Sequence, residues 1–137
     1  MEVIVPVERT LTRLDHVRLT RVLAHAPGPA AAVLQELLDG SHQVDSPAVA
    51  PTVVTMYTQL LLEDAGGGSE PVRLTLCYPD DAEPANGFIS VLSPVGAALL
   101  GMRVGELARW RTPDGQERSG RILGVLFQPE ASGDYTT

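Results

Sequence analysis

Residues 89–101 carry the clearest structural signal in this chain, and they read Ile89-Ser-Val-Leu-Ser-Pro-Val-Gly-Ala-Ala-Leu-Leu-Gly101. The apolar and β-branched start of this segment predicts a strand over residues 88–92. Ser93 followed by Pro94 is typical of a helix start, because serine caps the first turn and proline fits the first helical position. The small and apolar residues that follow predict a short helix that Gly101 stops. The segment therefore belongs to a domain of mixed α and β structure.

Further strands are predicted on both sides of this segment. The predicted strands cover residues 53–62, 71–78, 88–92, 108–112 and 118–127. The glycine-rich residues 64–69 join the first two, and Pro113-Asp-Gly115 is a strong tight-turn signal between the last two. In the second strand the buried positions alternate with polar residues and with Cys77, so we expect Cys77 to face away from the core. About five strands should curl against one short helix.

The first fifty residues predict two short helices. Thr12, with Asp15 three residues later, resembles a capping box at the start of the first helix. Ala26-Pro-Gly-Pro29 breaks the helical pattern, and the second helix then places its apolar residues on one side. These residues are Val33, Leu34, Leu37 and Leu38. The fold prediction is thus α+β: an antiparallel helical hairpin, a short coiled coil, over residues 1–50, a linker over residues 44–51, and an antiparallel β-domain over residues 51–137.

Composition excludes several classes of function. The chain carries ten Arg and no Lys against 17 acidic residues, a net charge of −7, which disfavours direct binding to DNA. The single cysteine excludes an internal disulfide, and the three histidines lack the spacing of metal ligands, so no metal or cofactor is expected. No signal peptide or membrane span is recognisable, which predicts a cytoplasmic protein.

The order of these motifs resembles the C-terminal domain of the Gre transcript-cleavage factors. The Ser93-Pro94 helix ending in Ala-Leu-Leu-Gly101 is followed by Val104-Gly-Glu106 and by Thr112-Pro-Asp-Gly115, as in that family. The resemblance implies an FKBP-like β-domain that binds RNA polymerase near its secondary channel. It also implies that Ser93 and Pro94 form a docking point, although capping the helix is an alternative role for both. Leu92 stands where Gre factors typically carry Asp or Asn.

The tip of the predicted hairpin departs from the Gre pattern. It contains His25, Pro27, Gly28 and Pro29, and no carboxylate lies between residues 24 and 31. Gre factors place carboxylates there, because transcript hydrolysis needs them to hold a second Mg²⁺. We therefore expect a non-enzymatic regulator, a monomer, that competes with Gre factors for polymerase. The alternatives are a weak cleavage factor, an FKBP-like prolyl isomerase, for which six aromatic residues are few, and a homo-oligomeric scaffold.

Overall fold

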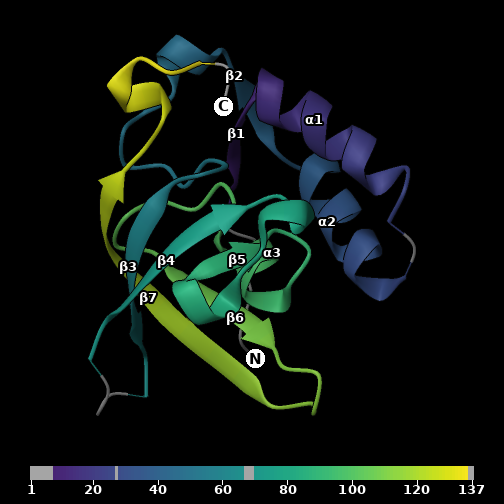
Figure 1. Ribbon diagram of the computed structural model, residues 1–137, viewed down its shortest axis with the longest axis vertical. Helices are drawn as coiled ribbons and strands as arrows, with labels where there is room; N and C mark the ends of the chain where they lie inside the picture. The colour runs from purple at the N-terminus through teal and green to yellow at the C-terminus, as the bar shows by residue number, and fades with distance from the viewer. Residues whose placement is uncertain (1–7, 27, 67–69, 136–137) are drawn as a thin grey trace, which may run out of the picture.

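The computed structural model describes residues 8–26, 28–66 and 70–135 (Figure 1). The elements in chain order are β1 (Thr10–Thr12), α1 (Arg13–Leu23), α2 (Pro29–Asp39), β2 (His42–Val44), β3 (Gln59–Asp64), β4 (Val72–Cys77), β5 (Phe88–Ser90), α3 (Pro94–Leu99), β6 (Leu107–Arg111) and β7 (Glu117–Phe127). The described residues also form the short 3₁₀ turns η1 (Ser46–Ala48), η2 (Pro79–Asp81), η3 (Pro84–Asn86) and, after β7, η4 (Glu130–Ser132). The mixed α+β architecture predicted from sequence is confirmed.

Five strands form one sheet in the order β5-β4-β3-β7-β6. The pairs β3–β4, β3–β7 and β6–β7 are antiparallel, but β5 runs parallel to β4, with Thr75 opposite Phe88. The prediction of a wholly antiparallel sheet is therefore wrong at this edge. Residues 78–87, which contain η2 and η3, carry the chain back to the level of Thr75 in β4, so that β5 can run parallel to it, a connection that a two-residue hairpin turn could not make.

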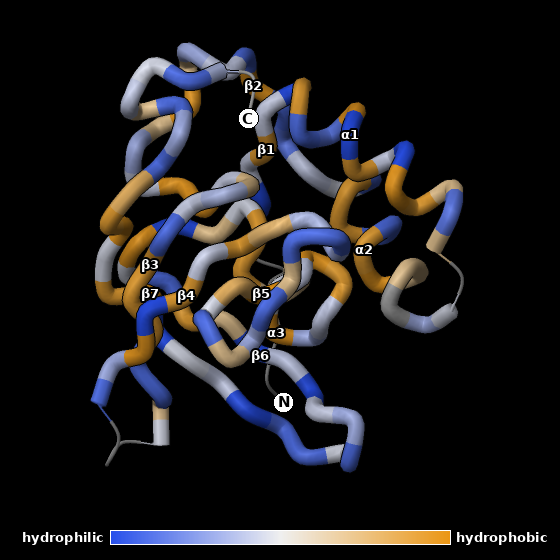
Figure 2. The backbone as a smooth tube through the Cα atoms, in the orientation of Figure 1, coloured by the Kyte–Doolittle hydropathy of each residue, from blue (hydrophilic) through white to orange (hydrophobic). Residues whose placement is uncertain are grey.

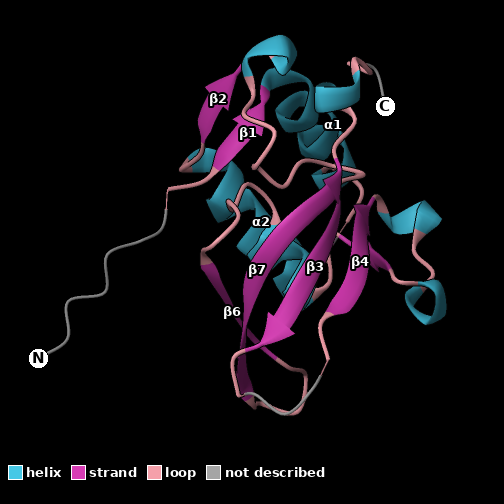
Figure 3. Cartoon of the chain, turned by 90° about the vertical axis from the view of Figure 1, so that its left-hand side faces the viewer, coloured by secondary structure: helices cyan, strands magenta, loops and turns pink. Residues whose placement is uncertain are grey.

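The two N-terminal helices lie on one side of the sheet (Figures 1 and 3). A second, two-stranded sheet joins the two ends of this helical segment, because β1 before α1 pairs in parallel with β2 after α2. The Thr10 amide also donates to the Gly101 carbonyl at 3.1 Å, directly after α3. The predicted linker is partly wrong, since Val44 belongs to β2 and Val49 is buried.

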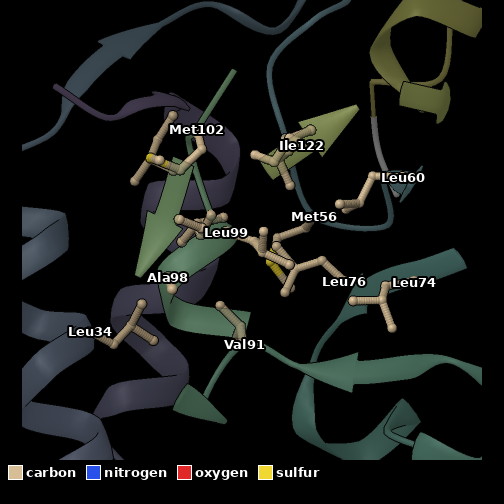
Figure 4. Packing of buried hydrophobic residues seen from close by; sticks show 14 of the residues in the cluster. Leu34, Met56, Leu60, Leu74, Leu76, Val91, Ala98, Leu99, Met102 and Ile122 are labelled. Atoms are coloured by element: carbon tan, nitrogen blue, oxygen red, sulfur yellow. The ribbon is translucent and has the colours of Figure 1, made fainter. Parts of the chain in front are cut away.

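One hydrophobic core unites the helices with the sheet. Figure 4 shows Leu34 of α2 pointing toward Ala98 of α3, with Leu76 and Ile122 of the sheet in the same cluster. Leu11, Leu19 and Leu38 join it from the N-terminal part. The apolar stretches of the tube in Figure 2 gather along β3, α2 and α3, whereas the connection between β6 and β7 is hydrophilic. About 25 cal/mol of stabilisation comes from each Å² of apolar surface that such a core removes from water.

Two local predictions about the strands are wrong. The first strand begins at Gln59 rather than residue 53, because residues 53–58 are held by turn contacts, among them the Thr55 amide donating to Thr58 Oγ1 at 2.9 Å. Tyr57 there has a φ of 65°, which no strand allows. Cys77 is fully buried, and its thiol lies 3.5 Å from the Ile89 carbonyl of the parallel neighbour β5.

Gly96 in α3 occupies a position that admits no side chain. A Cβ atom there would lie 2.0 Å from the Ser90 carbonyl oxygen, so either the helix or the end of β5 must move. We expect Gly96→Ala to lower the free energy of unfolding by about 3 kcal/mol or more in urea denaturation.

Gly124→Ala in β7 is the matched control for this change. A Cβ atom at Gly124 meets nothing within 4 Å, so that variant should retain wild-type stability or gain up to about 1 kcal/mol. Equal stability of the two variants would contradict the packing that the structure shows at α3.

Candidate functional site

A groove of about 480 Å³ lies where α2, α3 and β6 meet. Here α2, but not α1, forms one surface together with α3 and the edge of the sheet. Its lining residues are Arg9, Pro29, Val33, Leu37, Leu92, Ser93, Pro94, Ala97, Ala98, Arg109, Trp110 and Arg111. The lining is therefore mostly apolar, with arginines as its charged residues. Both predicted docking residues, Ser93 and Pro94, lie in it.

Ser93 is held rigidly at the start of α3. Its Oγ accepts a hydrogen bond from the Gly96 amide at 3.1 Å and donates one to the Ser90 carbonyl at 2.6 Å. The predicted capping role is confirmed, and Pro94 occupies the first turn of the helix as expected. A capped, tightly bonded turn presents its exposed proline at the groove with little conformational entropy left to lose on binding.

Arg9 closes the other end of α3. Its Nη1 donates to the carbonyls of Ala97 and Leu100, at 3.1 and 2.8 Å, which the helix itself leaves without partners. Burial lowers the pKa of this guanidinium below its ordinary value, and the charge of Glu106 opposes that shift. The residue just before β1 thus fixes the helix that forms one wall of the groove.

Apolar side chains from both parts of the chain line the groove. Val33 of α2 is 55% exposed, whereas Leu34 beside it is fully buried in the core. Trp110 of β6 is partly buried, packing against the core cluster while it also lines the groove. The exposed valine and the partly buried indole belong to one apolar lining, and covering it with an apolar partner would lower the free energy of the complex.

Positive charge borders this apolar surface, although the whole chain is acidic. Arg109 and Arg111 extend from β6, and both are exposed. Arg111 forms an ion pair with Glu117 of β7 at 3.1 Å. Opposite charge on an incoming surface would be attracted here and repelled over much of the remaining surface.

The predicted tip residues lie in different places. Pro29 begins α2 and lines the groove, and Gly28 before it has a φ of 108°, which favours glycine. His25 is exposed after α1, with its amide donating to the Val22 carbonyl. Pro27 lies outside the described residues.

Local sequence patterns gave no sign of the arginines in the groove, and they assigned all the apolar residues of α2 to a single contact. The pattern placed Val33 and Leu37 on the same side as Leu34 and Leu38, and the structure uses only the latter two as fully buried core. The signal available in the sequence was the width of the apolar face of α2, which is greater than packing against the core alone requires. For Arg9 and Arg109 nothing in the local sequence pointed to the groove.

The structure offers no alternative metal or membrane site within the residues it describes. No three His, Cys, Asp or Glu side chains of those residues gather in a way that could hold a metal ion. None of the described helices has the length and the apolar character that crossing a bilayer requires.

Comparison with known proteins identifies the family. Residues 49–127 match the family described as transcription elongation factor GreA/GreB, C-terminal, and this segment contains α3, the whole five-stranded sheet and most of the residues that line the groove. The chain belongs to the GreA/GreB family. The Gre resemblance inferred from the sequence motifs is thus confirmed.

Three relatives locate the chain within the family. It is 38% identical over 112 residues to the Regulator of nucleoside diphosphate kinase of Escherichia coli K12, with 82% of each chain covered. It is 53% identical over 74 residues to the transcription elongation factor GreA of Solidesulfovibrio magneticus, of which it spans 44%. A solved GreA/GreB structure from Nitrosomonas europaea superposes with a TM-score of 0.74 at 33% identity, covering 89% of this chain and all of that one.

The Arg9 contacts give a prediction for the groove wall. Arg9→Ala leaves the Ala97 and Leu100 carbonyls without the guanidinium, so we expect the free energy of unfolding to fall by about 1–3 kcal/mol in urea denaturation. Arg73→Ala, which removes an exposed arginine from β4, is the control and should change stability by less than about 0.5 kcal/mol. If Arg9→Ala lowered the free energy of unfolding no more than Arg73→Ala, the stabilising role of the Arg9 hydrogen bonds would be contradicted.

Proposed function

We propose that this chain is a non-enzymatic regulator of transcription that binds RNA polymerase near its secondary channel. Membership of the GreA/GreB family supports the assignment to transcription. The groove supports a particular docking surface for the polymerase, because its apolar lining includes Ser93 and Pro94 and is bordered by arginines. In this proposal residues 51–137 act as an FKBP-like docking domain. Residues 1–50, which include α1 and α2, act as a short hairpin that inserts, at least in part, into the channel.

The lining of the groove defines the polymerase surface that it fits. An apolar side chain would cover Val33 and Trp110, and acidic neighbours would meet Arg109 and Arg111. The net charge of −7 opposes nucleic acid as the occupant, so the docking surface is a protein surface without sequence-specific contact to DNA.

The hairpin tip argues for competition without chemistry. Residues 24–31 contain no carboxylate, so the chain has nothing at the tip that could hold a second Mg²⁺ beside a backtracked transcript. By occupying the docking surface, the protein would exclude Gre factors without replacing their cleavage activity.

The Escherichia coli relative extends this proposal to a regulated enzyme. That protein is named as a regulator of nucleoside diphosphate kinase, and 82% of its length is matched. We infer that this chain affects the same kinase by changing transcription. A direct complex between the purified chain and the kinase would contradict that route.

Arg109→Glu tests the groove as the docking surface. The exposed Arg109 side chain contributes charge rather than core packing, so its reversal should weaken binding to immobilised RNA polymerase at least tenfold while leaving thermal unfolding unchanged. Arg73→Glu, the same reversal on β4, is the control and should bind like wild type. Equal binding of all three proteins would move the docking site away from the groove.

A second assay separates the regulator from an enzyme. Saturating wild-type protein should reduce Gre-stimulated cleavage in backtracked elongation complexes, and on its own it should stimulate none. Cleavage by this chain alone would identify the alternative, a cleavage factor. Acceleration of prolyl isomerisation in a model peptide would identify the other alternative, an isomerase.

A further inference from the structure

Asp15 lies buried where α1 packs against the sheet domain. Asp15 is only 1% exposed, and its Oδ2 accepts a hydrogen bond from the Met56 amide at 3.2 Å. Met56 precedes β3 and is itself fully buried. This carboxyl therefore joins two segments that are 41 residues apart in the chain. The Asp15 amide also donates to Thr12 Oγ1, which fixes the residue in the first turn of α1.

Several titratable groups act on this carboxyl. The charge of Glu130, from η4, opposes ionisation of Asp15, and Arg18, one turn later on α1, favours it. The phenol of Tyr78, after β4, lies in the same electrostatic cluster. Thr55 Oγ1 donates to Glu130 Oε1 at 2.6 Å and so holds this second carboxyl in place.

Two other polar contacts of α1, with α2 and with the segment after β2, do not involve Asp15. From α2, the Leu38 carbonyl lies 3.3 Å from the His16 ring. Beyond β2, Asp45 pairs with Arg13 at 2.8 Å, and both of those side chains are exposed. The Arg13 and Asp45 side chains are thus in contact with solvent, whereas Asp15 is buried.

The surroundings of Asp15 oppose its charge. Burial is the largest effect and raises the pKa of this carboxyl to about 7 from its usual value of 3.8, and the charge of Glu130 adds to the increase. The hydrogen bond from Met56 and the charge of Arg18 offset only part of it. Near neutral pH both protonation states of Asp15 are therefore populated.

We propose that Asp15 makes the joint between α1 and the sheet domain respond to pH, so that protonation of its carboxyl tightens the joint and ionisation loosens it. The protonated carboxyl is neutral, still accepts the Met56 hydrogen bond and avoids the cost of a buried charge. The ionised carboxylate recovers hydration only when α1 moves away from residues 55–58. The joint is thus a proton-operated hinge within a single chain.

The sign of the effect follows from linkage. The pKa of Asp15 is higher in the closed joint than in the open one, so the closed state binds the proton more tightly. The stabilisation is fully present below about pH 4 and declines as the pH rises toward 7, above which it is lost. With closed and open values of about 7 and 3.8, the opening constant rises about tenfold between pH 6 and pH 8.

Opening of the hinge should change the groove, because α2 packs against α1 and also lines the groove. Leu34 and Leu38 of α2 share the core with α1, and Val33 of α2 lines the groove opposite α3. Resting on the proposed function, we expect the affinity for RNA polymerase to fall as the pH rises from 6 to 8. The hinge itself is tested without polymerase, so its failure and that of the proposed function are distinguishable.

The test is a pH titration of the full chain by ¹⁵N NMR together with amide hydrogen exchange. The Met56 amide resonance should titrate with a midpoint near pH 7, and it should be constant in Asp15→Asn. After correction for the intrinsic rate, exchange in α1 should increase about tenfold between pH 6 and pH 8 in wild type only. Exchange in β7 should not follow the same change.

Two further variants keep the test decisive. Glu130→Gln retains an acceptor for Thr55 and removes the like charge, so the Met56 midpoint should shift to lower pH even if Asp15→Asn does not fold. Asp39→Asn removes an exposed carboxylate from α2 and should leave the midpoint unchanged. A Met56 amide that does not titrate between pH 5.5 and 8.5 would overturn the proposal, as would equal exchange in α1 at both pH values.

Discussion

The backbone of α3 packs so closely against the end of β5 that no side chain fits between them, and both the core and the groove are built around this contact. A Cβ atom at Gly96 would lie 2.0 Å from the Ser90 carbonyl oxygen, and Ser93 bridges the same gap with two hydrogen bonds. This contact fixes the direction of a six-residue helix that could not be stable alone. Leu99 and Leu100 then enter the core, while Pro94 remains exposed at the groove.

The N-terminal helices extend that core instead of forming a separate one. Leu34 and Leu38 pack into the same cluster as the sheet, and Arg9 bonds to the end of α3. The groove consequently has walls from both parts of the chain, and its shape depends on how firmly they are joined. A buried carboxyl at that joint is costly, because its hydrogen bond from Met56 only partly replaces hydration. This cost is the physical basis of the pH response that we propose for Asp15.

Much of the fold could be predicted because several signals are local. Serine followed by proline at residues 93–94 specifies a helix start, and Pro113-Asp-Gly115 specifies a tight turn, where Gly115 has a φ of 87°. The parallel pairing of β5 could not be predicted in this way, since the connection over residues 78–87 chooses its direction by tertiary contacts. The buried course of residues 53–58 was missed for a related reason: a β-branched apolar run fits both a strand and a buried turn.

The family, the capped α3 helix and the uncharged tip can be recognised from neighbouring residues, because the preferred conformations and chemistry of those residues do not depend on distant partners. The packing of the elements, by contrast, determines that Val33 lines a groove while Leu34 is core, and that Arg9 binds the end of a helix about ninety residues away. It also determines that Asp15, by pattern an ordinary first-turn acid, is buried against Met56. Burial and long-range hydrogen bonds arise from how elements pack, and local sequence carries no record of them.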